Sequence, residues 1–281
     1  MTRTLLIPLV STGNVPQLTT DLVLHSLSKE FQFVKCLDST YLHPFVGPLD
    51  YVFEQQEPVL FNKSNVNKNY STALELFYNE SRSLYVIQQR TPVIQGYLNN
   101  FVKEIICPLV QEFKITDVVI LDSFGALDED IVANTSRTSK TNSFYSDAIC
   151  QVRSVGEVVR EMESGLHLNP ASEQQSNNNV ISTLFQFTND SVQQEVSTRQ
   201  QAFKFAYHLL NSPVSELQRI KYCSAFVHEG DNSYDAHLLC DHLPNVIEGF
   251  AKINVHTPPI SWKGVYGTRP IPTSFDEGIY I

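Results

Sequence analysis

The 281-residue sequence lacks features that define several common classes of protein. No apolar run approaches the length needed to cross a bilayer, so we expect no membrane-spanning segment. A basic excess is also missing: the net charge is −10 and the pI is near 5.2. This balance argues against a nucleic-acid groove and against binding to an anionic membrane surface. The apolar stretch after Met1 is short and has no small-residue cleavage site, so we interpret it as a strand and not as a signal peptide.

Cysteine usage is equally sparse, with five residues and no C-x-x-C pair. An odd number of widely separated cysteines makes a poor disulfide framework. Buried, reduced thiols in a cytosolic protein are the simpler interpretation. The five are Cys36, Cys107, Cys150, Cys223 and Cys240.

Patterns typical of bound cofactors and metals are missing as well. The loop Ser11–Asn14 contains a single glycine, too few for a phosphate-cradling loop, and no G-x-S-x-G elbow surrounds Ser123. The histidines His228, His237 and His242 do not share a metal-ligand spacing. We therefore expect neither a cofactor nor a metal ion.

Apolar periodicity is what the sequence does contain, beginning with a β–α–β pattern. Thr4–Val10 is a continuous apolar run of strand length, Gln17–Leu27 has helical spacing, and Phe31–Leu37 alternates between apolar and polar residues. Such an opening indicates a parallel sheet covered by helices. Pro8 inside the first run favours an edge position or a local bulge.

Further elements continue this alternation. We predict four more strands: Thr72–Tyr78, Ser83–Gln89, Ile115–Leu121 and Ile220–Val227. We predict three more helices: Gly96–Lys114 with a kink at Pro108, Gln201–Asn211, and Tyr234–Leu243 with Ser233 as N-cap and Pro244 as stop. The fold class predicted is an α/β sandwich with a largely parallel central sheet flanked by helices.

The domain organisation predicted is one α/β domain over residues 1–268 and an extended tail over residues 269–281. Two polar tracts, Asn134–Ser143 and Glu173–Asn179, lack apolar residues and are predicted to be disordered insertions. Between them, Phe144–Asn169 contains a possible helix.

Two groups of polar residues are candidates for function. Asp122 and Ser123 follow one predicted strand and His228, Glu229 and Asp231 follow another, at the edge where parallel sheets bind ligands. For the first pair, turn hydrogen bonds at a strand end are the favoured interpretation.

The second group is Gln88–Pro92, after a strand, together with Asn99 and Asn100 on a helix with an apolar stripe. Loop packing and a helix surface, or a flat protein-binding face, are equally good interpretations.

The last three residues, Ile279, Tyr280 and Ile281, form a hydrophobic–Tyr–x terminus. An aliphatic side chain, an aromatic ring with a polar tip and a free carboxylate offer three means of recognition. Pro270 and Pro272 stiffen the spacer before them. A frayed chain end is the alternative interpretation.

Several segments, collinear over nearly the whole chain, resemble the proteasome assembly chaperone family in its fungal form. They are Gly13–Leu18, Leu37–Leu42, Phe45–Asp50, Ser71–Tyr78, Ile87–Pro92, Tyr97–Phe101, Ile220–Ser224, Glu229–Ser233, Ile260–Gly264 and Tyr266–Gly267, followed by the terminal motif.

The resemblance implies a heterodimer with a paralogue, proteasome assembly chaperone 1, that binds the outer face of the proteasome α-ring during assembly of the 20S particle. It implies that Ile279, Tyr280 and Ile281 insert between adjacent α-subunits and that the bound pair blocks premature docking of activators. No catalytic residue is implied. The implied location is cytoplasmic, with the nucleus left open. The alternative is a nucleoside-phosphorylase-like enzyme that uses a crevice near Asp122 and His228.

Overall fold

The computed structural model of the chain describes residues 2–62, 68–125, 151–154, 198–227 and 230–266. Both predicted polar tracts, the possible helix after residue 154 and the C-terminal tail lie outside these residues. The predicted boundary at residue 268 lies outside them too, and it stays a prediction.

A seven-stranded mixed sheet forms the centre of the fold, in the order β2-β5-β6-β1-β7-β9-β8. The strands are β1 (Thr4–Pro8), β2 (Phe31–Cys36), β5 (Leu74–Asn79), β6 (Leu84–Gln89), β7 (Asp117–Gly125), β8 (Gln151–Ser154) and β9 (Arg219–Val227). The four consecutive strands β6, β1, β7 and β9 are parallel, and the pairs at both edges are antiparallel. A separate two-stranded sheet pairs β3 (Val46–Gly47) with β4 (Ser71–Thr72), and α2 (Val59–Asn62) lies between them in sequence.

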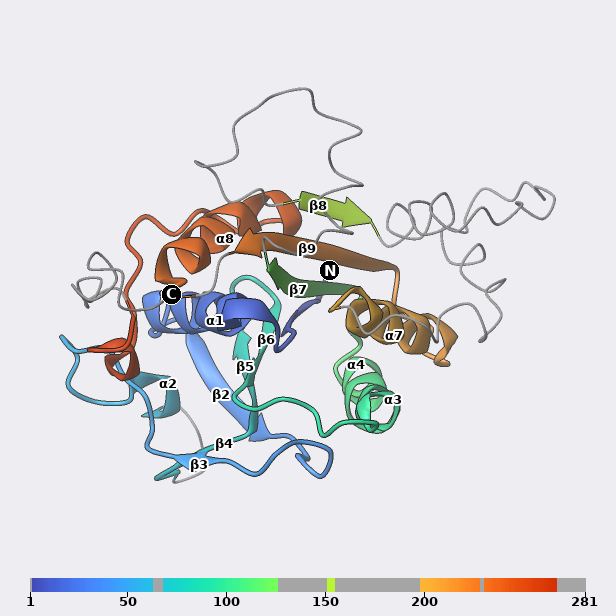
Figure 1. The fold of residues 1–281 in the computed structure, drawn as a ribbon, viewed down its shortest axis with the longest axis horizontal. Helices are drawn as coiled ribbons and strands as arrows, with labels where there is room; N and C mark the ends of the chain where they lie inside the picture. Colours follow the sequence, from blue (N-terminus) through green and yellow to red (C-terminus); the bar gives the residue numbers. More distant parts are fainter. Residues whose placement is uncertain (1, 63–67, 126–150, 155–197, 228–229, 267–281) are drawn as a thin grey trace, which may run out of the picture.

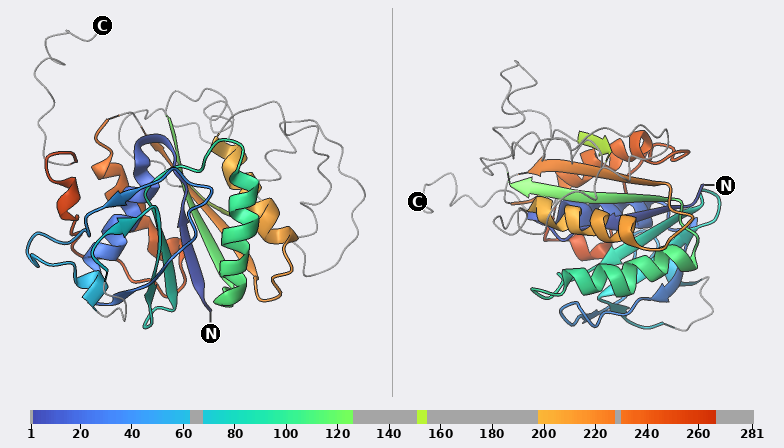
Figure 2. Two further views of the ribbon diagram at one scale, coloured as in Figure 1. Left: turned by 90° about the horizontal axis from the view of Figure 1, so that it is seen from below. Right: turned by 90° about the vertical axis from the view of Figure 1, so that its right-hand side faces the viewer.

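Helices cover both faces of the large sheet (Figures 1 and 2). One face carries α1 (Val15–Ser26) and α8 (Ser233–Val246), and the other carries α3 (Leu98–Asn100), α4 (Cys107–Glu112) and α7 (Thr198–Asn211). Alternate residues of β1 contribute to the two cores: Leu5 and Ile7 pack with the second group of helices and Leu6 with the first. The predicted sandwich of helices around a largely parallel sheet is confirmed.

The prediction of an edge position for the first strand is wrong, because β1 lies between β6 and β7. Pro8 is tolerated there because it is the last residue of β1. The pairing with β6 covers only Thr4 to Leu6, so the missing N–H is not needed on that side. On the β7 side, the hydrogen bonding continues with Leu9 N–H, which donates to the carbonyl of Leu121 across 2.9 Å.

The predicted helix over Gly96–Lys114 is present but irregular. Between α3 and α4 the six residues Phe101–Ile106 form a π-helix, and Pro108 lies in the first turn of α4. Proline has no N–H to donate to the preceding turn, so the interruption expected at Pro108 takes the form of a change in helix type.

Both predicted boundaries of α8 need correction. The helix begins at Ser233, so Asn232 and not Ser233 is its N-cap, and the Ser233 N–H binds the Asp231 carboxylate across 3.0 Å. Pro244 does not stop the helix, which continues to Val246. Within the described residues, no helix is long and apolar enough to cross a membrane.

Candidate protein-binding site at the root of the C-terminal segment

The predicted binding residues Ile279, Tyr280 and Ile281 lie outside the described residues. The last described residue is Tyr266. We call the segment from Thr257 to Tyr266 the root of the tail.

Backbone contacts hold the root against two segments from the first fifth of the chain. Thr257 N–H donates to Ser26 Oγ across 2.9 Å, at the end of α1. Ile260 N–H donates to the carbonyl of Tyr51 across 2.8 Å, next to an isolated bridge between Val52 and Pro259. The root is therefore packed on the domain and is not part of a free tail.

Trp262 is the centre of the root. It closes the short 3-10 helix η5 (Ile260–Trp262), is only 4% exposed, and packs in the core on the α1 side of the sheet. Its indole Nε1–H donates to Asp21 Oδ2 across 3.2 Å. The ring also packs edge-on against Tyr266, with the centroids 5.7 Å apart. Anchoring a Trp by both its apolar ring and its N–H is the usual arrangement for a buried indole.

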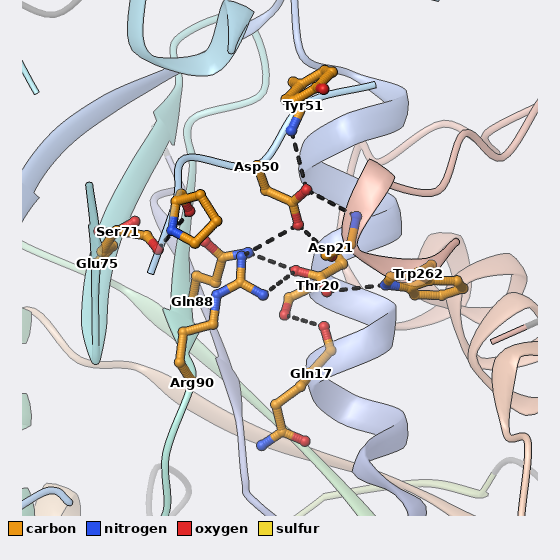
Figure 3. A network of polar contacts seen from close by, with 12 residues as sticks. Gln17, Thr20, Asp21, Asp50, Tyr51, Ser71, Glu75, Gln88, Arg90 and Trp262 are labelled. Carbon is orange, nitrogen blue, oxygen red and sulfur yellow. Dashed lines mark hydrogen bonds and ion pairs between the residues drawn. The ribbon is translucent and has the colours of Figure 1, made fainter. Parts of the chain in front are cut away.

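Two buried carboxylates receive the root (Figure 3). Asp21 on α1 accepts from Trp262 and, through Oδ1, from Gln88 Nε2 at 2.5 Å. Asp50 accepts from Ser261 twice, with N–H at 3.2 Å and Oγ at 2.5 Å. The root thus supplies three donors to carboxylates that are almost fully buried, and buried charges need such partners.

Arg90 lies between the two carboxylates. Its Nη1 is 3.4 Å from Asp21 Oδ1 and its Nη2 is 3.9 Å from Asp50 Oδ2. Because one guanidinium faces two carboxylates, the cluster of Arg90, Asp21 and Asp50 has an excess of negative charge. The N–H and O–H donors of the root partly offset this charge. His25, one turn after Asp21 on α1, is also buried. Burial lowers the pKa of His25, while the fields of Asp21 and Asp50 act in the opposite direction.

For Gln88 and Gln89, this arrangement decides between the two interpretations. Gln88 and Gln89 are 4% and 3% exposed, and Gln89 Nε2 donates to the carbonyl of Thr91 across 2.8 Å. They belong to the interior, so they cannot form part of a flat binding face. Asn99 and Asn100 are exposed, so the surface interpretation stays open for them; their side chains contact His208 and Glu104, each at 3.0 Å.

Apolar and cationic side chains surround the point where the described chain ends. Phe53 and Val265 are 58% and 54% exposed, and Lys263 Nζ lies 4.7 Å from the centre of the Phe53 ring. Aromatic and aliphatic groups beside a cation are common in protein-binding surfaces.

The strand-end candidates Asp122 and Ser123 lie inside β7, because this strand runs four residues beyond its predicted end. Both are completely buried. Ser123 Oγ donates to the carbonyl of Thr12 across 2.6 Å and lies 2.8 Å from Ser11 Oγ. Ser123 N–H also binds Asp122 Oδ1 at 2.8 Å. The predicted strand-end position is therefore wrong, but the polar groups of Ser123 make internal hydrogen bonds.

The other strand-end candidates follow β9, which pairs with β7. His228 and Glu229 lie outside the described residues, and Asp231 accepts a hydrogen bond from Ser233 N–H across 3.0 Å at the start of α8. In the described part of the chain, no group of three or more His, Cys, Asp or Glu residues could hold a metal ion.

The pairing of Asp21 with Trp262 was not among the predictions from the sequence. Two signals were available: Trp262 is the only Trp in the chain, and Asp21 is the single charged residue between Gln17 and Leu24 in an apolar helix. Neither signal indicates that the two residues meet, because 241 positions separate them.

Comparison with known sequences identifies the family. The sequence profile of the PAC2 family matches residues 5–217. The chain is 36% identical over 270 residues to Proteasome assembly chaperone 2 of Saccharomyces cerevisiae, and the match covers 94% of each chain. A Nematostella vectensis protein of the same name is 30% identical over 125 residues, which cover 44% of this chain and 47% of that relative.

Solved structures agree at the level of the fold. Pyrococcus furiosus PbaA, described as an archaeal homolog of proteasome-assembly chaperone, has a TM-score of 0.50 and 8% identity, covering 90% of this chain and 80% of PbaA. A protein of unknown function from Thermoplasma acidophilum has a TM-score of 0.51 and 8% identity, covering 89% of this chain and 79% of that protein. The family profile and the yeast relative confirm the resemblance that the sequence motifs indicated: this chain belongs to the PAC2 family.

Proposed function

We propose that this protein is a proteasome assembly chaperone that acts by binding other proteins. The observation that carries this proposal is the 36% identity to the yeast chaperone over 94% of both chains. A match of that extent does not depend on one shared motif.

The proposed contact with the proteasome is the C-terminal tail. Ile279, Tyr280 and Ile281 insert between adjacent α-subunits on the outer face of the α-ring, with the terminal carboxylate paired to a cation there. Occupying this pocket promotes assembly of the 20S particle and keeps activators from docking early. The root supports this arrangement, because its last described residues leave the domain beside the exposed Phe53 and Val265.

The proposed working form is a heterodimer with a paralogous chaperone, proteasome assembly chaperone 1, located in the cytoplasm and in the nucleus where proteasomes are also present. Catalysis is not part of the proposal. The enzyme alternative uses a crevice near Asp122 and His228; Asp122 is completely buried inside β7, and His228 lies outside the described residues.

A pull-down from cell lysate tests the proposal. The tagged full chain should capture its paralogue and proteasome α-subunits, identified by mass spectrometry, and should capture few mature particles already capped by activators. A chain lacking Ile279–Ile281 should still capture the paralogue and lose most of the α-subunits. Equal recovery of α-subunits by both chains would contradict the proposed role of the tail.

A further inference from the structure

The root of the tail ends four residues after Trp262, and short-range hydrogen bonds fix this last stretch. Val265 N–H and Tyr266 N–H both donate to the Trp262 carbonyl at 2.9 Å. The contacts that fix the position of Trp262 therefore also fix the position of Tyr266. Only residues 267–281 follow.

We propose that Trp262 and Asp21 are positioning residues, which fix the point where the C-terminal tail leaves the domain and so set how far its terminal motif can reach. This inference rests on the proposed function of Ile279–Ile281. It deepens that function by assigning a role to residues far from the motif in sequence.

The carboxylate of Asp21, which binds Trp262, is held by contacts with two different elements. Asp21 lies in the middle of α1, and its other oxygen binds Gln88 on strand β6. Arg90 faces both Asp21 and Asp50. A side chain held by a helix and a strand at once fixes its partner more precisely than a loop contact does.

The contacts of the root are also directional. Three donors from Ser261 and Trp262 satisfy buried carboxylate oxygens. If the root left, the two carboxylates would lose these three donors, which is costly. Apolar contacts alone would allow several positions of the root along the domain. These hydrogen bonds specify one register.

The anchor changes the length of the tether. With the anchor in place the tether is residues 267–281, which extend at most about 50 Å. Release from Pro259 onward would add the eight residues 259–266 and extend the limit to roughly 80 Å. For a flexible tether, effective concentration falls with about the −3/2 power of length, so release alone should weaken binding only about twofold. A loss of reach is therefore a sharper test than a loss of affinity.

The test compares four forms of the heterodimer for binding to immature 20S particles. They are the wild type, a chain lacking residues 268–275, the anchor variant Ser261→Ala with Trp262→Ala, and the combination of the two. The deletion removes as many residues as release of the root would add. Each form is first checked for its melting temperature and for binding to the paralogue.

We expect the shortened tail to bind at least tenfold more weakly than the wild type, and the anchor variant about twofold more weakly. The combination should recover to within a few-fold of the wild type, because eight residues of the root replace those deleted. A residue with only a structural role could not restore binding in this way. Inserting eight Gly/Ser residues after Tyr266 in the shortened chain should also restore binding.

Several results would overturn the inference: normal binding by the shortened chain, no recovery in the combination, or no recovery with the Gly/Ser insertion. A chain lacking Ile279–Ile281 distinguishes a wrong positioning role for the anchor from a wrong function for the tail. If it binds like the wild type, the tail itself has no role; if it loses binding while the shortened chain does not, only the positioning role is wrong.

A second measurement applies if the anchor variant does not fold. Trp262→Phe keeps a smaller aromatic ring in the core and removes the N–H that binds Asp21. Trypsin should then cut after Lys263 about tenfold faster than in the wild type, as the root opens more often. Cutting after Arg82, in the distant β5–β6 turn, should be unchanged. Equal rates after Lys263 would show that the Asp21 contact does not hold the root.

Discussion

The indole N–H of Trp262 donates to the carboxylate of Asp21, and this bond joins the last described segment of the chain to the middle of its first helix. A hydrogen bond to a charged group contributes about 1.5–3 kcal/mol when it is buried. Trp262→Phe should therefore lower the free energy of unfolding by about that amount, measured by urea denaturation.

Tyr234→Phe is the matched control, because it also removes a polar group from an aromatic side chain but at a residue that is 65% exposed. We expect a change below about 0.5 kcal/mol there. Equal effects of the two substitutions would mean that the Asp21 contact contributes nothing measurable.

The hydrogen-bonded pair Ser11 and Ser123 should behave as one unit. Ser11 Oγ lies 2.8 Å from Ser123 Oγ and accepts from Ser123 N–H at 3.0 Å. Replacing either serine by Ala should cost about 1 kcal/mol, and the double variant should cost clearly less than the sum. Additive costs in a double-mutant cycle of denaturation curves would show that the two hydroxyls act independently.

Gly13 combines a left-handed backbone with a close contact. Its φ is +67°, and a Cβ there would lie 2.3 Å from Asn232 Nδ2, in the segment before α8. Gly249 has a similar φ of +75° with nothing within 4 Å. Gly249→Ala should cost about 1 kcal/mol from backbone strain alone. Gly13→Ala should cost more in the same denaturation assay, and equal costs would contradict the close packing.

Stability should fall below neutral pH. Burial is the main cause that lowers the pKa of His25, His208 and His237 below the ordinary 6.5. The unfolded chain therefore binds more protons than the folded chain as the pH falls below about 7. The stability that depends on these histidines being neutral is complete above that pH. It is lost as the pH decreases toward their pKa values in the folded state.

Each histidine adds a slope of up to about 1.4 kcal/mol per pH unit in this window. Denaturation at several pH values between 5 and 7.5 measures the slope. His25→Gln should reduce it, since one of the three groups no longer titrates. A slope that is unchanged in His25→Gln would show that burial does not keep this histidine neutral.

The helices and strands could be predicted well from the sequence, but which strands lie side by side in the sheet could not. Leu5, Leu6 and Ile7 form an unbroken apolar run because each side of β1 faces helices, and this pattern gives a buried strand from local information alone. The central position of β1 could not be predicted, because it depends on where the pairing with β6 stops relative to Pro8. The antiparallel edges depend on the same non-local pairings.

The candidate site shows the same limit. The terminal motif could be proposed from sequence because its three means of recognition are adjacent in the chain. The anchor at Asp21, Asp50 and Trp262 could not, since its members are brought together only by the fold. Gln88 illustrates the difficulty, because a polar residue near the end of a strand has no local signal that it is bound to a buried carboxylate.

The central claim is that the tail binds the proteasome, and the affinity of the purified heterodimer for immature 20S particles tests it most directly. We predict that Tyr280→Ala and deletion of Ile279–Ile281 weaken binding by about thirty- to a thousandfold, as expected for loss of a buried Tyr anchor, with part of this masked by the contacts of the paralogue. Tyr280→Phe should lose less, and one residue added after Ile281 should also weaken binding because it moves the carboxylate. Equal affinity of all these forms, with unchanged melting temperatures, would contradict the account.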